Sequence, residues 1–179
     1  MNKKENTGII PECYVDTNLT ETLTGIVCNH QKGCANVVKQ MNEKRGDRFA
    51  LGIIDMDKRA VGYVSEFLLI AGNESLQVLK HKSRPHYLIY IIPAIEGFVL
   101  RAVEELNIVL SDFGLPAGLM ELKQETKQQD SKRDPRFVRL FQSLKDASGP
   151  RTLRSVVEYL HANPYSADPN EIERLISVV

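Results

Sequence analysis

The chain lacks a net charge of either sign, and it lacks any long apolar run. Lysine and arginine together number 23, as do aspartate and glutamate, which excludes a uniformly basic nucleic-acid coat but leaves room for a local basic patch. No apolar stretch approaches the roughly 18 residues that a membrane-spanning helix needs. The first residues also lack the apolar core of a secretory signal. We therefore expect a cytoplasmic protein with no membrane partner.

Cysteine is scarce as well. The three cysteines are an odd number and give no paired disulfide framework. Cys28, His30 and Cys34 lie close together in sequence, but they lack the C-x-x-C spacing of a zinc site and an obvious fourth ligand. We expect reduced thiols at these positions rather than zinc.

The apolar pattern predicts an α/β fold. Four segments have the composition of strands: 8–12, 49–54, 75–79 and 87–92. Three segments between or after them have helical spacing: 17–28, 35–44 and 96–106. This alternation predicts one α/β domain over residues 8–110, with a mostly parallel, Rossmann-like sheet flanked by helices.

The composition changes after residue 110. Residues 111–136 are predicted to form a polar linker or an exposed helix, because 121–136 is almost wholly polar. Residues 137–179 are predicted to form a small C-terminal helical extension. Its helices would begin near three residue pairs: Asp134-Pro135, Gly149-Pro150 and Asp168-Pro169.

Two acidic clusters follow two of the predicted strands. Glu12 and Asp16 come after the first strand, and Asp55 and Asp57 follow the strand over 49–54. The carboxyl ends of parallel strands share one edge of a sheet, so four carboxylates would gather there and repel one another without a cation. A set with no histidine or cysteine favours Mg²⁺ or Mn²⁺ over zinc. The alternative is a pair of solvated turns in which Asp16 caps a helix.

Other residues are weaker candidates for the same site. Glu96 lies in the first turn of the helix after strand 87–92 and is a further candidate metal ligand, although a helix N-terminus favours an acid in any case. Four basic residues are candidates for contacts with a nucleic-acid backbone, the alternative being that they are only solvated. They are Lys58, Lys80, Lys82 and Arg84.

The acidic clusters together resemble the signatures of Toprim domains, the catalytic module of bacterial primases, topoisomerases and OLD-family nucleases. Glu12-Cys-Tyr-Val-Asp16 is similar to the E-G-x-x-D opening of the family, although Cys13 stands where many members have glycine. Ile53-Ile-Asp55-Met-Asp57 is similar to its second signature, an apolar strand that ends in D-x-D. The resemblance covers roughly residues 8–92. In the family, helices and a short strand join the two signature strands.

This resemblance implies a role for each acid. Glu12 would be the general acid or base, Asp55 and Asp57 the metal ligands, and Asp16 an assisting residue. Neither a topoisomerase tyrosine nor a primase zinc module can be assigned, so the small nuclease-like members are the nearest relatives. The implied activity is Mg²⁺- or Mn²⁺-dependent cleavage or nicking of nucleic acid, with DNA favoured over RNA.

The resemblance also implies a setting and leaves alternatives open. Small Toprim proteins resemble components of anti-phage systems that work beside a separate ATPase, and this chain has no Walker A sequence of its own. A catalytically silent, Toprim-like regulatory or partner-binding module is one alternative. Another is a PIN-like ribonuclease, because Tyr14-Val-Asp16-Thr-Asn18 is similar to a PIN signature and would make Asp16 the principal ligand. The oligomeric state is open.

Overall fold

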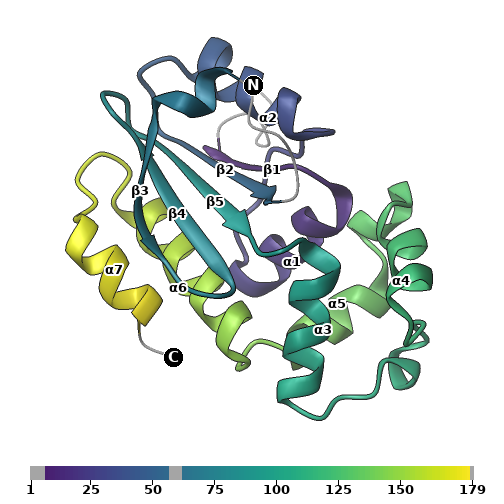
Figure 1. Ribbon diagram of the computed structural model, residues 1–179. Helices are drawn as coiled ribbons and strands as arrows, with labels where there is room; N and C mark the ends of the chain where they lie inside the picture. Colours follow the sequence, from purple (N-terminus) through teal and green to yellow (C-terminus); the bar gives the residue numbers. More distant parts are fainter. Residues whose placement is uncertain (1–6, 57–61, 178–179) are drawn as a thin grey trace.

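A computed structural model describes residues 7–56 and 62–177 (Figure 1). It has an α/β fold built on a five-stranded sheet with the order β1-β2-β5-β4-β3. The strands are β1 (Ile9–Pro11), β2 (Ala50–Asp55), β3 (Phe67–Gly72), β4 (Leu76–His81) and β5 (His86–Ile91).

Four of the five strands run in the same direction. β1, β2 and β5 are parallel neighbours, whereas β4 is antiparallel to both β5 and β3. The sheet is therefore mixed, with β4 alone reversed. The predicted α/β class with a mostly parallel sheet flanked by helices is confirmed at this level.

Successive residues of β1 and β2 enter two different cores, because neighbouring side chains of a strand point to opposite faces. Ile9 and Ile53 belong to the larger core, whereas Ile10 and Ile54 belong to the smaller one. Most of the helical residues in the larger core come from α1 (Tyr14–Thr24), α3 (Ile95–Glu105), α5 (Pro135–Ser143), α6 (Ser148–Ala162) and α7 (Pro169–Ser177). The smaller core is covered by α2 (Cys34–Lys39) and the π-helical η2 (Gln40–Arg45).

The remaining elements are short helices. They are η3 (Gly62–Glu66), η4 (Leu110–Phe113), α4 (Leu119–Thr126) and η5 (Gln129–Lys132). α4 packs on α3, and η5 packs on α1. Leu122 of α4 is fully buried. The segment predicted as a polar linker or exposed helix thus contains a helix, α4, whose side chains are mostly exposed or half-buried and which packs on the domain through Leu122 and Thr126.

The C-terminal helices share the core of the sheet rather than forming one of their own. Phe137, Leu153 and Ile176 belong to the same buried cluster as Ile9 of β1. α7 lies alongside β3 (Figure 1), where the side-chain amide of Asn73 donates to the carbonyl oxygen of Ile176 at 3.2 Å. The segment predicted as an extension thus completes the layer on this face.

The connection from β1 to β2 differs from the expectation in two respects. The resemblance to Toprim domains implies a short strand within this connection, but residues 12–49, all described, contain helices and no strand. The first helix begins at Tyr14 rather than Thr17, because a capping box stabilises its start: the thiol of Cys13 accepts from the amide of Asp16, whose carboxylate accepts from the amide of Cys13.

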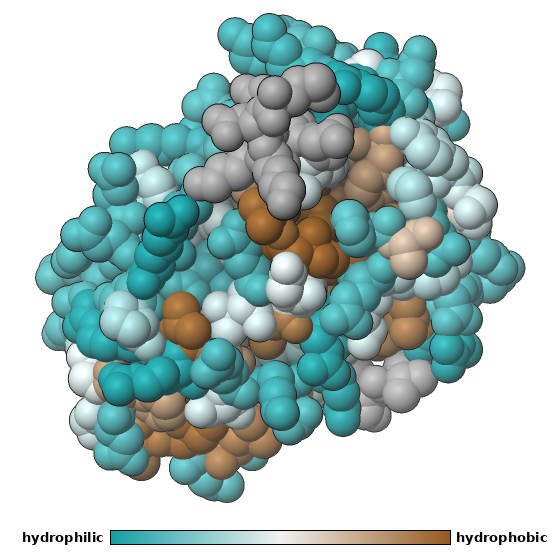
Figure 2. Space-filling view, turned by 180° about the vertical axis from the view of Figure 1, so that it is seen from behind, coloured by the Kyte–Doolittle hydropathy of each residue, from teal (hydrophilic) through white to brown (hydrophobic). Residues whose placement is uncertain are grey.

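The face seen in Figure 2 has apolar patches near its middle and at its lower left. That face is mostly hydrophilic, and its apolar side chains gather in separate patches. None of the helices within the described residues is long and apolar enough to cross a membrane.

Candidate functional site

Three acidic residues follow the three neighbouring parallel strands at one edge of the sheet. Glu12 comes directly after β1, Asp55 ends β2, and Glu96 lies in the first turn of α3, which follows β5. All three line one pocket of about 360 Å³. The structure thus brings together three of the five acids that the sequence singles out.

Glu12 and Asp55 are linked through the backbone. The amide of Asp55 donates to Oε2 of Glu12 at 3.3 Å, and the amide of Ile95 donates to Oδ1 of Asp55 at 3.0 Å. The two side chains are only 1% and 7% exposed. Buried carboxylates need such donors, and these amides hold both of them at the edge of the sheet.

Glu96 is held by a residue of α4. The hydroxyl of Thr126 donates to Oε1 of Glu96 at 2.5 Å, and both residues are buried. α4 therefore forms one wall of the pocket and orients its third carboxylate. Two exposed cations, Lys32 and Lys127, also line the pocket.

Asp16 lies nearby but faces another partner. Its Oδ2 accepts the amide of Cys13 at 3.1 Å within the capping box, and within the described residues it does not line the pocket of Glu12 and Asp55. Burial, together with the carboxylates of Asp16 and Asp55, raises the pKa of the Cys13 thiol well above its usual value. Cys13 is therefore a protonated cap at neutral pH and not a reactive thiolate.

An aromatic pair stands beside the acids. The rings of Tyr14 and His30 stack with centroids 4.4 Å apart and planes 24° from parallel. Nδ1 of His30 lies 3.1 Å from the hydroxyl of Thr17 and 3.2 Å from the carbonyl oxygen of Cys13. Burial and the nearby charge of Lys132 lower the pKa of His30, so its ring is neutral at pH 7.

Three of the predicted basic residues lie at the other end of the sheet. Lys80 pairs with Tyr87 near the start of β5, whereas the acids gather beyond the end of β5. At roughly 3.3 Å per residue, a six-residue strand separates the two ends by about 17 Å. Lys82 follows β4 at that same far end, and Arg84 donates there to Oδ1 of Asn42 at 2.8 Å. Lys80, Lys82 and Arg84 therefore do not line the acidic pocket.

The remaining predicted site residues, Asp57 and Lys58, lie outside the described residues. Within 7–56 and 62–177, no group of three or more histidine, cysteine, aspartate or glutamate side chains is placed to hold a metal ion. In proteins Mg²⁺ keeps several waters and binds through one or two carboxylates together with substrate phosphates.

The sequence alone did not assign Thr126, Lys127 and the Tyr14–His30 pair to the site. Tyr14 lies within the first acidic cluster, between Glu12 and Asp16, which is a signal for its place near the site. Thr126 and Lys127 lie in a polar segment with no apolar periodicity to place it. Their position depends on tertiary hydrogen bonds that local pattern does not reveal.

No protein-family model, curated protein or solved structure matches this chain. The assignment of a function therefore depends on the site itself. That site consists of three buried carboxylates at the carboxyl edge of parallel strands, flanked by two lysines and a stacked aromatic pair.

Proposed function

We propose that the protein is a Toprim-like enzyme that cleaves or nicks nucleic acid with the help of Mg²⁺ or Mn²⁺. The observation that carries the proposal is the convergence of Glu12, Asp55 and Glu96 in one pocket beyond the ends of β1, β2 and β5. In open α/β sheets, ligands bind in the crevice outside the carboxyl ends of the strands.

The proposed ligands are Asp55 and Glu96, with Asp57 supplying a further carboxylate from outside the described residues. Asp55 and Glu96 come from adjacent elements, and the amide of Ile95, the residue before Glu96, donates to Asp55. A divalent cation bound there would stabilise the charge on the attacking and leaving oxygens of a phosphodiester.

Glu12 is the proposed general acid or base. It is nearly fully buried, and one of its carboxylate oxygens is fixed by the amide of Asp55. A positioned carboxylate of this kind can exchange a proton with a reacting group. Lys32 and Lys127 line the same pocket and would attract the phosphate backbone of the substrate.

The geometry favours this assignment over a PIN-like one. A PIN-like site would need Asp16 as its principal ligand, whereas the carboxylate of Asp16 accepts a capping hydrogen bond from Cys13. We also propose that any ATP-driven step, as in an anti-phage system, belongs to a separate ATPase, since the sequence has no Walker A motif.

Plasmid nicking tests the proposal. Supercoiled DNA is incubated with the wild-type protein in Mg²⁺, Mn²⁺ or EDTA, and the Asp55→Asn variant is compared with Asp146→Asn, which changes an exposed acid in the same way. The asparagine introduced by Asp55→Asn retains an oxygen for the amide of Ile95, so the fold should survive. We expect cation-dependent nicking that Asp55→Asn lowers by about 100-fold or more and Asp146→Asn leaves unchanged.

Two results would overturn the proposal. Nicking by Asp55→Asn at the wild-type rate would remove Asp55 from the site. Absence of cleavage of DNA and RNA substrates by the wild-type protein with either cation would favour the catalytically silent, partner-binding module instead.

A further inference from the structure

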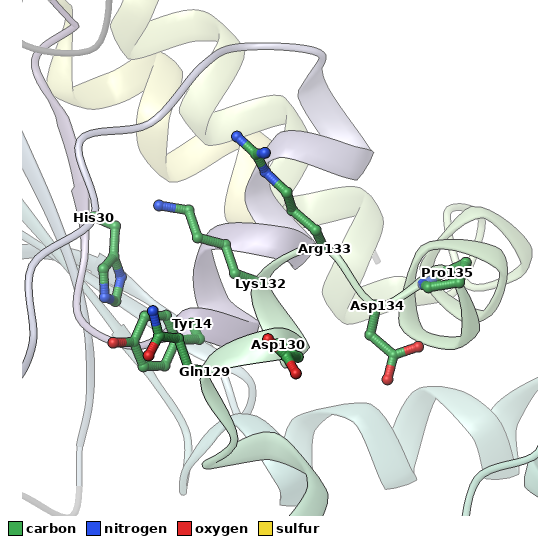
Figure 3. A pocket seen from close by; sticks show the side chains of 8 residues that line it. All are labelled: Tyr14, His30, Gln129, Asp130, Lys132, Arg133, Asp134 and Pro135. Atoms are coloured by element: carbon green, nitrogen blue, oxygen red, sulfur yellow. The ribbon is translucent and has the colours of Figure 1, made fainter.

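A second hollow of about 720 Å³ adjoins the acidic pocket. The two are neighbours because Tyr14 and His30 line both of them. The other residues of the second hollow come from η5 and the start of α5, as Figure 3 shows: Gln129, Asp130, Lys132, Arg133, Asp134 and Pro135. The proposed cleavage site uses none of these.

Buried polar contacts fix this wall of the hollow. The side-chain amide of Asn18, in α1, donates to the carbonyl oxygen of Ser131 at 2.8 Å, and both residues are about 2% exposed. The hydroxyl of Ser131 in turn donates to the carbonyl oxygen of Thr126 at 2.9 Å. These bonds connect the second hollow to α4, which holds Glu96, so the two hollows share one rigid support.

The charges of the second hollow favour an anion. Lys132 extends toward His30 in Figure 3, and its charge contributes to the lowered pKa of that ring. Arg133 is exposed at the same wall. The carboxylate of Asp134 points away from both cations in Figure 3, and its Oδ2 lies 2.7 Å from Nη2 of Arg136, with which it is paired. Asp130 is exposed, as Arg133 is, so solvent and salt screen both charges alike. With Asp134 paired to Arg136, two cations stand against one remaining acid on this wall.

The Tyr14–His30 stack gives this hollow an aromatic wall. Both rings are half-buried, and the His30 ring is neutral, so its face suits stacking against another flat ring. Proteins that bind single-stranded nucleic acid combine a positively charged groove with aromatic side chains on which bases stack. In a duplex the bases are already stacked on one another and cannot reach such a wall.

We propose that the hollow formed by Tyr14, His30, Lys132 and Arg133 binds an unpaired stretch of nucleic acid, with a base on the aromatic pair and phosphates at the two cations. This inference rests on the proposed function, because it names single-stranded nucleic acid as the substrate class of the same site. The strand would run from this hollow into the pocket of Glu12, Asp55 and Glu96.

Fluorescence anisotropy with a labelled oligonucleotide of about 15 nucleotides, long enough to fill a single-strand site, and its matched duplex tests the inference. The titrations are done in EDTA, so that binding is measured without cleavage. We expect the wild-type protein to bind the single strand at least about 10-fold more tightly than the duplex. The double variant Lys132→Gln/Arg133→Gln should weaken this binding at least about 10-fold. It should also make the fall of log K with log salt shallower, reducing the magnitude of the slope by about 1.4.

Two further variants complete the design. Tyr14→Leu keeps an apolar side chain but removes the ring, and it should weaken binding about 5- to 100-fold, as the loss of one stacked base would. The control double variant Lys145→Gln/Arg151→Gln also removes one lysine and one arginine charge, but from exposed positions that do not line the hollow. It should leave the affinity for the single strand unchanged. Thermal melts show that each variant is folded.

The results separate this inference from the proposed function. Equal affinity for single strand and duplex, or equal loss in the hollow and control double variants, overturns the inference. Tight single-strand binding by wild type and by Asp55→Asn, without cleavage by either, keeps the inference and refutes the proposed function.

Discussion

The backbone amide of Asp55, the last residue of β2, donates a hydrogen bond to Oε2 of Glu12, the residue that follows β1. This bond of 3.3 Å joins two acids that are 43 positions apart in sequence. The amide of Glu12 also donates to the carbonyl oxygen of Ile53 at 3.0 Å, which continues the pairing of β1 with β2. The bond from Asp55 to Glu12 follows directly after this one. The placement of both carboxylates is thus a direct product of parallel strand pairing.

Glu12→Gln separates the charge of this residue from its structural role. Glutamine keeps a side-chain oxygen for the amide of Asp55, so the melting temperature should change little. It cannot accept a proton as a carboxylate does, so the single-turnover cleavage rate at saturating Mn²⁺ should fall roughly 10²- to 10⁴-fold. A rate within twofold of wild type would show that Glu12 is not the general acid or base.

Thr126→Val tests whether α4 orients the third carboxylate. Valine matches threonine in shape but removes the hydroxyl that donates to Glu96. Leaving a buried carboxylate oxygen without this donor should cost about 1–3 kcal/mol of stability. The Mn²⁺ concentration that gives half-maximal cleavage should also rise several-fold. Thr126→Ser, which restores a hydroxyl, should recover most of both effects; equal behaviour of the two variants would contradict the positioning role.

The substitution Gly52→Ala tests how tightly the smaller core is packed. A Cβ at this position of β2 would come within 2.6 Å of Cδ2 of Leu88 and 2.9 Å of Sδ of Met41. Gly52→Ala should therefore lower the free energy of unfolding by about 1–3 kcal/mol, because a filled core has no room for it. Gly62→Ala is the matched control, since nothing lies within 4 Å of its Cβ. Urea denaturation measures both, and equal effects would show that the core around Gly52 has room for a methyl group.

The fold should lose stability in acid because of His86. Burial lowers the pKa of this histidine to about 4, with smaller effects from the charges of His81 and Arg84. Its Nε2 lies 3.0 Å from the carbonyl oxygen of Arg48 and its Nδ1 2.7 Å from the hydroxyl of Tyr63, which assigns the proton to Nε2. The folded state therefore favours the neutral ring.

The sign of the effect follows from proton uptake. Between pH 6.5 and about 4 the unfolded chain binds a proton at His86 that the folded chain does not, so the free energy of unfolding falls as the pH falls. The loss from this residue between about pH 7 and 4 should be on the order of 3 kcal/mol. His86→Gln should be less stable at neutral pH but lose less on acidification. Denaturation curves with the same pH dependence in both proteins would contradict this.

The sequence predicted the strands that are covered on both faces better than β3, which has exposed apolar side chains. β1, β2 and β5 are nearly continuous apolar runs, as strands buried on both faces require. β3 was not assigned, and it differs from these strands in exposing two apolar side chains, Leu68 by 55% and Leu69 by 58%. Its apolar residues therefore do not alternate with polar ones.

The site, too, has a part that could be predicted from the sequence and a part that could not. The meeting of Glu12 and Asp55 could be predicted because both follow parallel strands that pair directly. The roles of Thr126 and Lys132 could not. Their positions depend on how α4 and η5 pack, and a single buried hydrogen bond from Asn18 to Ser131 fixes part of that packing. Such a bond leaves no periodic signal in a polar segment.

The binding of Mn²⁺, followed by the electron paramagnetic resonance signal of the free ion, tests the central claim most directly because it needs neither substrate nor turnover. Wild-type protein should bind Mn²⁺, and Asp55→Asn and Glu96→Gln should each weaken binding at least about 10-fold, whereas Asp146→Asn should bind as wild type does. Binding of equal strength in all four proteins, or no binding by wild type, would contradict a cation site formed by these carboxylates.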